Sequence, residues 1–147
     1  MSNESEVAKF KSKIIKPHRR INPCFMTGKG CVYTEQIDRE IEFRKNSKTY
    51  SGFMVLPFQP NISVFYELCL KRYIQGGYGT KEEPVEIMKA DQVRKTGYII
   101  CEKICKKIQE SDFVVVDVSV PNANVFYEMG LAYGIGQKVI IVYHKGS

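Results

Sequence analysis

The sequence has no long run of apolar residues. No segment of the 147 residues approaches the ~20 consecutive apolar side chains that a membrane-spanning helix needs. Residues 1–13, MSNESEVAKFKSK, also lack the apolar core of a secretion signal. We therefore expect a cytoplasmic protein without membrane association. With 44% hydrophobic residues, a chain of this length can bury the core of one globular domain.

The patterns of common nucleic-acid-binding domains are absent as well. The chain shows no helix-turn-helix, zinc-finger or RNP-like aromatic pattern, so we expect no nucleic-acid partner. Acidic residues are fewer than basic ones, 16 against 22, and the formal charge is +6. Much of the excess lies in residues 1–20 and favours an anionic partner, such as a phosphate-bearing small molecule. A solvated, partly disordered tail would explain the same basic residues.

The five cysteines do not suggest a disulfide framework. Their number is odd, and a reducing compartment would keep them as thiols or metal ligands. Cys69 is most simply a core residue. The other four thiols could form a structural zinc site that pins an N-terminal loop to a later helix, although a buried cysteine is often only a small hydrophobic residue. These four are Cys24, Cys31, Cys101 and Cys105.

Apolar runs alternate with helical patterns in the second part of the chain. The apolar runs predict strands at 53–58, 85–89, 113–118 and 139–143. Between them lie segments with helical spacing, of which the one at 97–112 places Ile100, Ile104 and Ile108 one turn apart. The alternation predicts an α/β fold with a parallel sheet and right-handed crossovers. We expect the flavodoxin-like or Rossmann-like strand order 2-1-3-4, with helices on both faces.

An N-terminal extension, residues 1–50, is expected to precede this α/β domain of residues 51–147. The extension contains a cysteine-bearing loop and a short helix beginning at Thr34, and a polar linker at 44–52 leads into the domain. Sheets of this class commonly have five strands. Four strands indicate either a domain truncated at its C-terminus or a homo-oligomer that covers the open edge.

The frame PN-x-x-VFYE-x-x-L occurs twice, at 60–70 and at 121–131. Each copy follows one of two strands expected to be neighbours, so the copies should line two sides of a crevice at the carboxyl ends of these strands. With Ser63 and Asn124 as N-caps, Glu67 and Glu128 would lie near the first helical turn, where the helix dipole favours a carboxylate. An ionised glutamate there could serve as nucleophile or general base. Capping and burial alone also explain the repeat.

Residues 111–142, SDFVVVDVSVPNANVFYEMGLAYGIGQKVIIV, resemble the signature of the nucleoside 2-deoxyribosyltransferase-like superfamily. In that group a strand ending in an acidic residue leads through an Asn-rich turn into a helix that begins YELG-x-A. The resemblance extends over about 52–143. The segment CFMTGKGC at 24–31 is also similar to the C-x-x-TG-x-x-C opening of uncharacterised prokaryotic members.

The resemblance implies cleavage or transfer of an N-glycosidic bond in a nucleoside or nucleotide, without a cofactor. Glu128 takes the position of the nucleophile that forms a covalent glycosyl ester, and Asp117 joins it as a catalytic residue. Asn124 borders the sugar with Asp117, and Gly130 permits close helix packing. The expected substrate-binding residues lie on the two turns and the second helix, and they are Pro57, Phe58, Asn61, Asn122, Asn124, Tyr127 and Gly130.

One residue departs from the pattern of active transferases. They carry an acid eight residues before the position of Asp112, where this chain has Ile104, and Glu102 lies on another side of that helix. Glu67 could supply a second carboxylate from across the crevice. The alternative is a catalytically silent nucleotide-binding sensor that signals to a partner or a fused domain. Under either interpretation the side chains of Lys89, Arg94 and Lys95 would meet phosphates.

Overall fold

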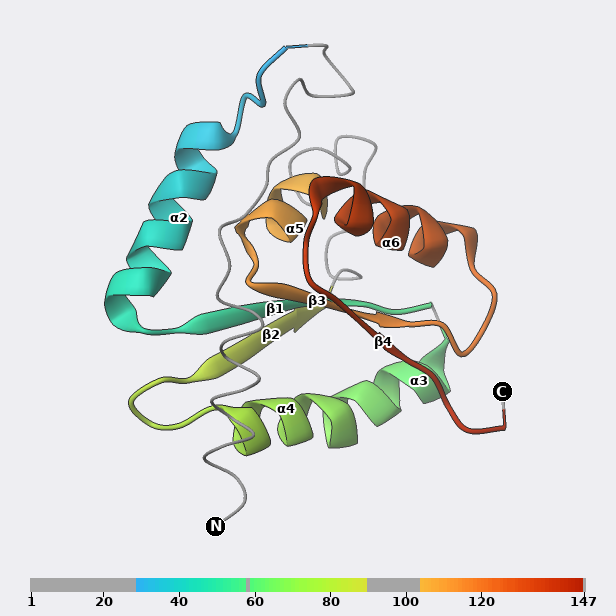
Figure 1. Ribbon diagram of the computed structural model, residues 1–147. Helices are drawn as coiled ribbons and strands as arrows, with labels where there is room; N and C mark the ends of the chain where they lie inside the picture. The colour runs from blue at the N-terminus through green and yellow to red at the C-terminus, as the bar shows by residue number, and fades with distance from the viewer. Residues whose placement is uncertain (1–28, 58, 90–103, 147) are drawn as a thin grey trace.

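The structure, a computed structural model, describes residues 29–57, 59–89 and 104–146 (Figure 1). Its centre is a four-stranded, all-parallel sheet with the order β2-β1-β3-β4. The strands are β1 (Tyr50–Val55), β2 (Val85–Lys89), β3 (Phe113–Asp117) and β4 (Val139–Val142). The expected α/β class and strand order are therefore confirmed. Within the described ranges, every helix is too short or too polar to cross a membrane.

Helices cover both faces of the sheet (Figure 1). One face carries a continuous helical stretch made of α3 (Pro60–Phe65), the π-helical segment η1 (Tyr66–Leu70) and α4 (Lys71–Tyr78). The other face carries α5 (Lys106–Glu110) and α6 (Ala123–Ile135). A further helix, α2 (Thr34–Ser47), packs beside α5.

The central strand β3 separates two hydrophobic cores. Val114 and Val116 pack with Val125 and Ala132 of α6 on one face. Phe113 and Val115 pack on the other face, with the helical stretch from α3 to α4. Because both faces of β3 are covered, all five of its residues are buried and its sequence is a continuous apolar run that ends in Asp117.

The start of β1 was predicted wrongly, and so was the polar linker at 44–52. The strand begins at Tyr50 instead of residue 53, and it ends at Val55. Helix α2 continues to Ser47, so Lys48 and Thr49 are all that separates it from β1. Lys48 adopts the left-handed conformation (φ 54°) that ends many helices, and its N–H points at the carbonyls of Arg44 and Lys45. Strands β3 and β4 each end one residue earlier than expected.

The predicted helix caps were also wrong. Helix α3, which carries the first copy of the repeat, begins at Pro60. The N–H that proline lacks would have no partner within the helix at this position, so its absence does not destabilise the helix. Helix α6 begins at Ala123 because the side chain of Asn122 accepts a hydrogen bond from the Val125 N–H at 3.1 Å. Glu67 and Glu128 therefore lie beyond the first turns, where the helix dipole has little effect. At its other end, α6 stops at Gly136, whose φ of 79° suits glycine.

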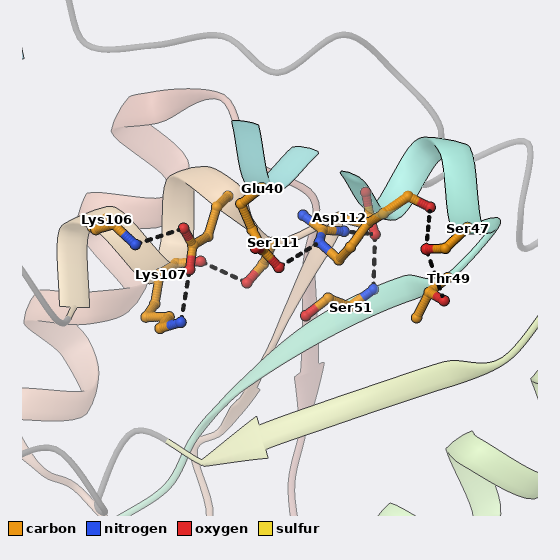
Figure 2. Close-up of polar contacts among 10 residues, drawn as sticks. Glu40, Ser47, Thr49, Ser51, Lys106, Lys107, Ser111 and Asp112 are labelled. Carbon is orange, nitrogen blue, oxygen red and sulfur yellow. Dashed lines mark hydrogen bonds and ion pairs between the residues drawn. The ribbon is translucent and has the colours of Figure 1, made fainter. Parts of the chain in front are cut away.

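Polar contacts attach α2 to the beginning of the sheet (Figure 2). The buried guanidinium of Arg44 forms an ion pair with Asp112, the residue before β3. Asp112 also accepts a hydrogen bond from the Ser51 N–H at 2.8 Å and donates its own N–H to the Ser51 carbonyl at 2.7 Å. The first residues of β1 thus pair with the chain entering β3. The division into an extension (1–50) and a domain (51–147) stays a prediction.

Candidate functional site

Asp117 is a buried carboxylate at the carboxyl end of β3. Its side chain is 2% exposed, and Oδ1 accepts a hydrogen bond from the Ser119 N–H at 2.8 Å, which fixes the turn after the strand. Neighbouring strand β1 ends at the same edge, because Val55 pairs with Val116. The helices after these two strands leave toward opposite faces. This is the topological switch point at which open α/β sheets bind ligands.

A pocket of about 410 Å³ opens beside Asp117. One wall comes from α3 and η1, and the other from the chain that leaves β4. Its lining residues are Phe65, Leu70, Asp117, Val142, Tyr143, His144 and Lys145. The pocket therefore combines apolar walls with one buried carboxylate, one imidazole and one lysine, a composition typical of small-molecule sites.

His144 is a candidate site residue that the sequence analysis missed. Its backbone N–H donates to Ser119 Oγ at 2.8 Å, and its ring lies edge-on to Phe65 with centroids 4.6 Å apart. Its Nε2 lies 3.8 Å from Asp117 Oδ2. The signal was present, because the predicted strand order makes β3 and β4 neighbours. In a parallel pair, residues just past the two strands lie side by side.

Glu128 lies on the face of α6 that packs against the sheet. It shares this face with Val125, Ala132 and Ile135 and is itself 5% exposed. Asp117 instead follows Phe113 and Val115 in the alternation along β3 and points to the opposite side, toward α3. The pocket beside Asp117 is lined without Glu128. The two carboxylates are thus held at one edge of the sheet by elements on opposite faces.

Glu67 forms ion pairs on the side of the sheet nearest β2. Its carboxylate lies 2.9 Å from Lys89 Nζ and 3.9 Å from Lys71 Nζ. The hydrogen bond from Lys89 is the main reason why the pKa of Glu67 is lowered; burial opposes it and the two lysine charges add to it. Lys89 also lies 3.4 Å from Ser63 Oγ, and 5.6 Å from the centre of the Tyr66 ring. The structure brings Glu67 to Lys89, and it places Glu67 and Glu128 on helices that cover opposite faces.

Replacing Lys89 by methionine is expected to raise the pKa of Glu67 and to make the free energy of unfolding less dependent on pH. A lowered carboxylate pKa adds stability above its ordinary value, and this stability is lost as the pH falls through the lowered value. The variant should thus lose stability at pH 7 and little at about pH 3. Because the Glu67 side chain is 43% exposed, we expect a loss of about 1 kcal/mol or less. Urea unfolding at both pH values measures it, and an equal loss at both would contradict the ion pair.

The expected substrate-binding residues are distributed unevenly around this edge. Pro57 is buried, and Asn122 is half-buried and caps α6. The side chains of Asn61, Asn124 and Tyr127 are exposed, and Phe58 lies outside the described residues, as do Arg94 and Lys95.

The packing role expected for Gly130 finds no support among the described residues. It lies on the exposed side of α6, and a Cβ atom there would meet nothing within 4 Å among the described residues. No neighbouring element in the described part therefore approaches closely enough to require a glycine at this position.

Two of the four cysteines expected at a zinc site lie close together. Gln109 Nε2 is 3.8 Å from Cys31 Sγ and 3.3 Å from Cys105 Sγ, so the sulfurs are no further apart than the sum of these distances. Cys24 and Cys101 lie outside the described residues, and the residues that the structure does describe hold no group of three or more His, Cys, Asp or Glu side chains that could bind a metal ion. Structural zinc stays a prediction. Cys69 is exposed, so its expected place in the core was wrong, because it faces outward from η1.

Comparisons with protein-family models, with curated proteins and with solved structures found no match to this chain. Function therefore has to be inferred from the chemistry of the residues at this edge of the sheet.

Proposed function

We propose that the protein binds a nucleoside or nucleotide at the carboxyl edge of its sheet and cleaves or transfers the N-glycosidic bond. The observation that supports this most is the place of Asp117, a buried carboxylate beside a small-molecule pocket at the topological switch point. The second support is the sequence resemblance of residues 111–142, in which Asp117 and Glu128 occupy the acidic positions.

The chemistry of this reaction suits a site with carboxylates. As the bond to the base breaks, positive charge develops on the sugar, and a preorganised negative group stabilises it. Asp117 supplies such a group in the pocket. The apolar side chains of Phe65, Leu70 and Val142 suit a planar base, and Lys145 suits a phosphate.

Glu128 is the proposed nucleophile. An oxygen of its carboxylate bonds to the anomeric carbon while the bond from that carbon to the base nitrogen breaks. The base keeps the electron pair of the broken bond, takes up a proton and leaves. Water or a second base then displaces the glutamate and restores the carboxylate. Because Glu128 is 5% exposed, substrate binding has to open the packing at the beginning of α6.

A binding module without turnover is the alternative. Ile104 is 3% exposed and belongs to the hydrophobic core with Phe53 and Val55, so the position at which active transferases carry an acid is filled by a packed apolar residue. The burial of Glu128 favours the same alternative. Such a protein would hold the nucleotide and pass the signal to a partner or a fused domain.

A panel of nucleosides, nucleotides and NAD tests the proposal. Released base is measured by chromatography for the unmodified protein, for Glu128→Gln and for Glu67→Gln. Loss of a nucleophile should lower release by at least about 100-fold, whereas loss of the ion-paired Glu67 should change it little. Mass spectrometry of the acid-quenched protein should find a glycosyl adduct on Glu128.

Three results would count against it. Binding without release supports the sensor. If the protein neither binds nor cleaves any compound of the panel, both functions are contradicted. Equal release by Glu128→Gln and the unmodified protein contradicts the role of Glu128, provided that thermal unfolding shows both to be folded.

A further inference from the structure

We infer that His144 is a catalytic residue that donates the proton to the leaving base, with Asp117 orienting its ring. This inference rests on the proposed function and adds to it the acid that the sequence analysis could not find. Because Ile104 is packed in the core, the proton donor of the proposed reaction has to come from another element. The chain that leaves β4 provides one.

The structure fixes His144 from three directions. The backbone is held by the hydrogen bond from its N–H to Ser119 Oγ at 2.8 Å, which joins the ends of β4 and β3. The ring packs edge-on against Phe65 of α3 at a centroid distance of 4.6 Å. Asp117 lies behind Nε2 at 3.8 Å. A side chain held this way keeps one orientation, which proton transfer at a defined atom requires.

The two ring nitrogens of His144 have different surroundings. Nε2 is buried, faces the carboxylate of Asp117 and has no hydrogen-bond partner among the described residues. The ring as a whole is 35% exposed and lines the pocket, so Nδ1 is the nitrogen left for a ligand. A carboxylate that orients an imidazole from behind while the second nitrogen serves the substrate is a recurring arrangement in hydrolytic enzymes.

If the distance from His144 Nε2 to the Asp117 carboxylate shortened by less than about 1 Å, the two groups would form a hydrogen bond. A change on this order is expected when a site closes on its ligand. Asp117 is held by its own hydrogen bond to the Ser119 N–H, and Ser119 also receives the N–H of His144. The same turn therefore sets the positions of both members of the pair.

The proton and the electron pairs balance in this step. Once the packing at the beginning of α6 has opened and Glu128 reaches the substrate at the carboxyl edge of the sheet, its carboxylate bonds to the anomeric carbon. The electron pair of the broken bond goes to the base nitrogen, and the proton of Nδ1 follows it. The imidazole is then neutral. It accepts a proton from the attacking water as the glycosyl ester breaks, which restores the charged ring.

Two leaving groups test the inference. The first substrate is the nucleoside of the panel that is cleaved fastest, with inosine and 2′-deoxyinosine included. The second is the 4-nitrophenyl glycoside of the same sugar, whose leaving group departs as a stable anion without a proton. In His144→Gln, base release from the nucleoside should fall by about 100-fold or more, while nitrophenolate release should stay within about threefold of the unmodified protein. Arg39→Gln is the control and should change neither rate, because Arg39 is exposed on α2, which attaches to the opposite end of the sheet.

The outcomes separate this inference from the proposed function. If His144→Gln lowers both rates equally, or neither, His144 does not donate the proton, although the site cleaves glycosides. If the unmodified protein releases neither base nor nitrophenolate, the proposed function fails and the inference fails with it. If His144→Gln unfolds within a few degrees of the unmodified protein, a selective loss of base release comes from the missing imidazole and not from misfolding.

Discussion

Replacement of Asp112 by alanine is expected to destabilise the protein by about 3–5 kcal/mol, because it leaves the Arg44 guanidinium as a buried charge without its counterion. The Arg44 side chain is 7% exposed, so water cannot replace the lost carboxylate. The substitution also removes the acceptor of the Ser51 N–H. Equilibrium unfolding in urea measures the loss. Hydrogen exchange should show it first in α2 and at the start of β1.

Two further variants separate the ion pair from other effects of the substitution. Combining Arg44→Met with Asp112→Asn should recover most of the stability, because a buried pair replaced by uncharged groups carries no uncompensated charge. Glu40 lies 3.6 Å from Arg44 Nε but is 46% exposed, so Glu40→Ala should cost about 0.5 kcal/mol or less. A double variant as unstable as the sum of its parts would show that the charge is not the cause.

Gly52→Ala should be the second most damaging of these substitutions. Gly52 lies in β1 beside Phe113 of β3, and a Cβ atom at this position would be 2.4 Å from Cζ of the phenyl ring. The ring is completely buried in a close-packed core, so moving it away would displace its neighbours. Overpacking of a filled core costs about 1–3 kcal/mol, and thermal or urea unfolding measures it.

The chain offers matched tests of this clash. Gly130→Ala adds the same methyl group where none of the described residues lies within 4 Å. It should leave stability unchanged or raise it by up to about 1 kcal/mol, since alanine favours the helix. In a Phe113→Leu background, Gly52→Ala should cost clearly less than in the unmodified protein. The same cost in both backgrounds would place the strain elsewhere than at the ring.

The sheet was predictable to the extent that its strands are apolar. The bounds of β2 match, and those of β3 and β4 differ by one residue, because buried parallel strands are continuous apolar runs. The beginning of β1 was missed because Tyr50, Ser51 and Gly52 do not form such a run. These residues join the sheet through contacts with Asp112 and Phe113, which are distant in the sequence.

The candidate site was predictable only in part, for a related reason. Strand order placed Asp117 at the switch point, and the structure has it there with a pocket beside it. The caps were misassigned because Asn122 and Asn124 are both good capping residues and spacing alone does not choose between them. His144 was missed because its partners Asp117 and Phe65 come from two other elements. Contacts that join three segments leave no local pattern.

The π-helical segment explains the regular four-residue period in the helical stretch from α3 to α4, which an α-helix alone would not keep on one side. Its inward side chains, Ile62, Tyr66, Leu70 and Ile74, are spaced by four residues throughout. In an unbroken α-helix, with 3.6 residues per turn, such a row would wind about 120° around the axis over these twelve residues. The wider turn at 66–70 takes up about one residue, or 100°, of that rotation and keeps the row on one side. Apolar residues spaced strictly by four over about three turns of a helix can therefore predict a π-helical turn from the sequence alone.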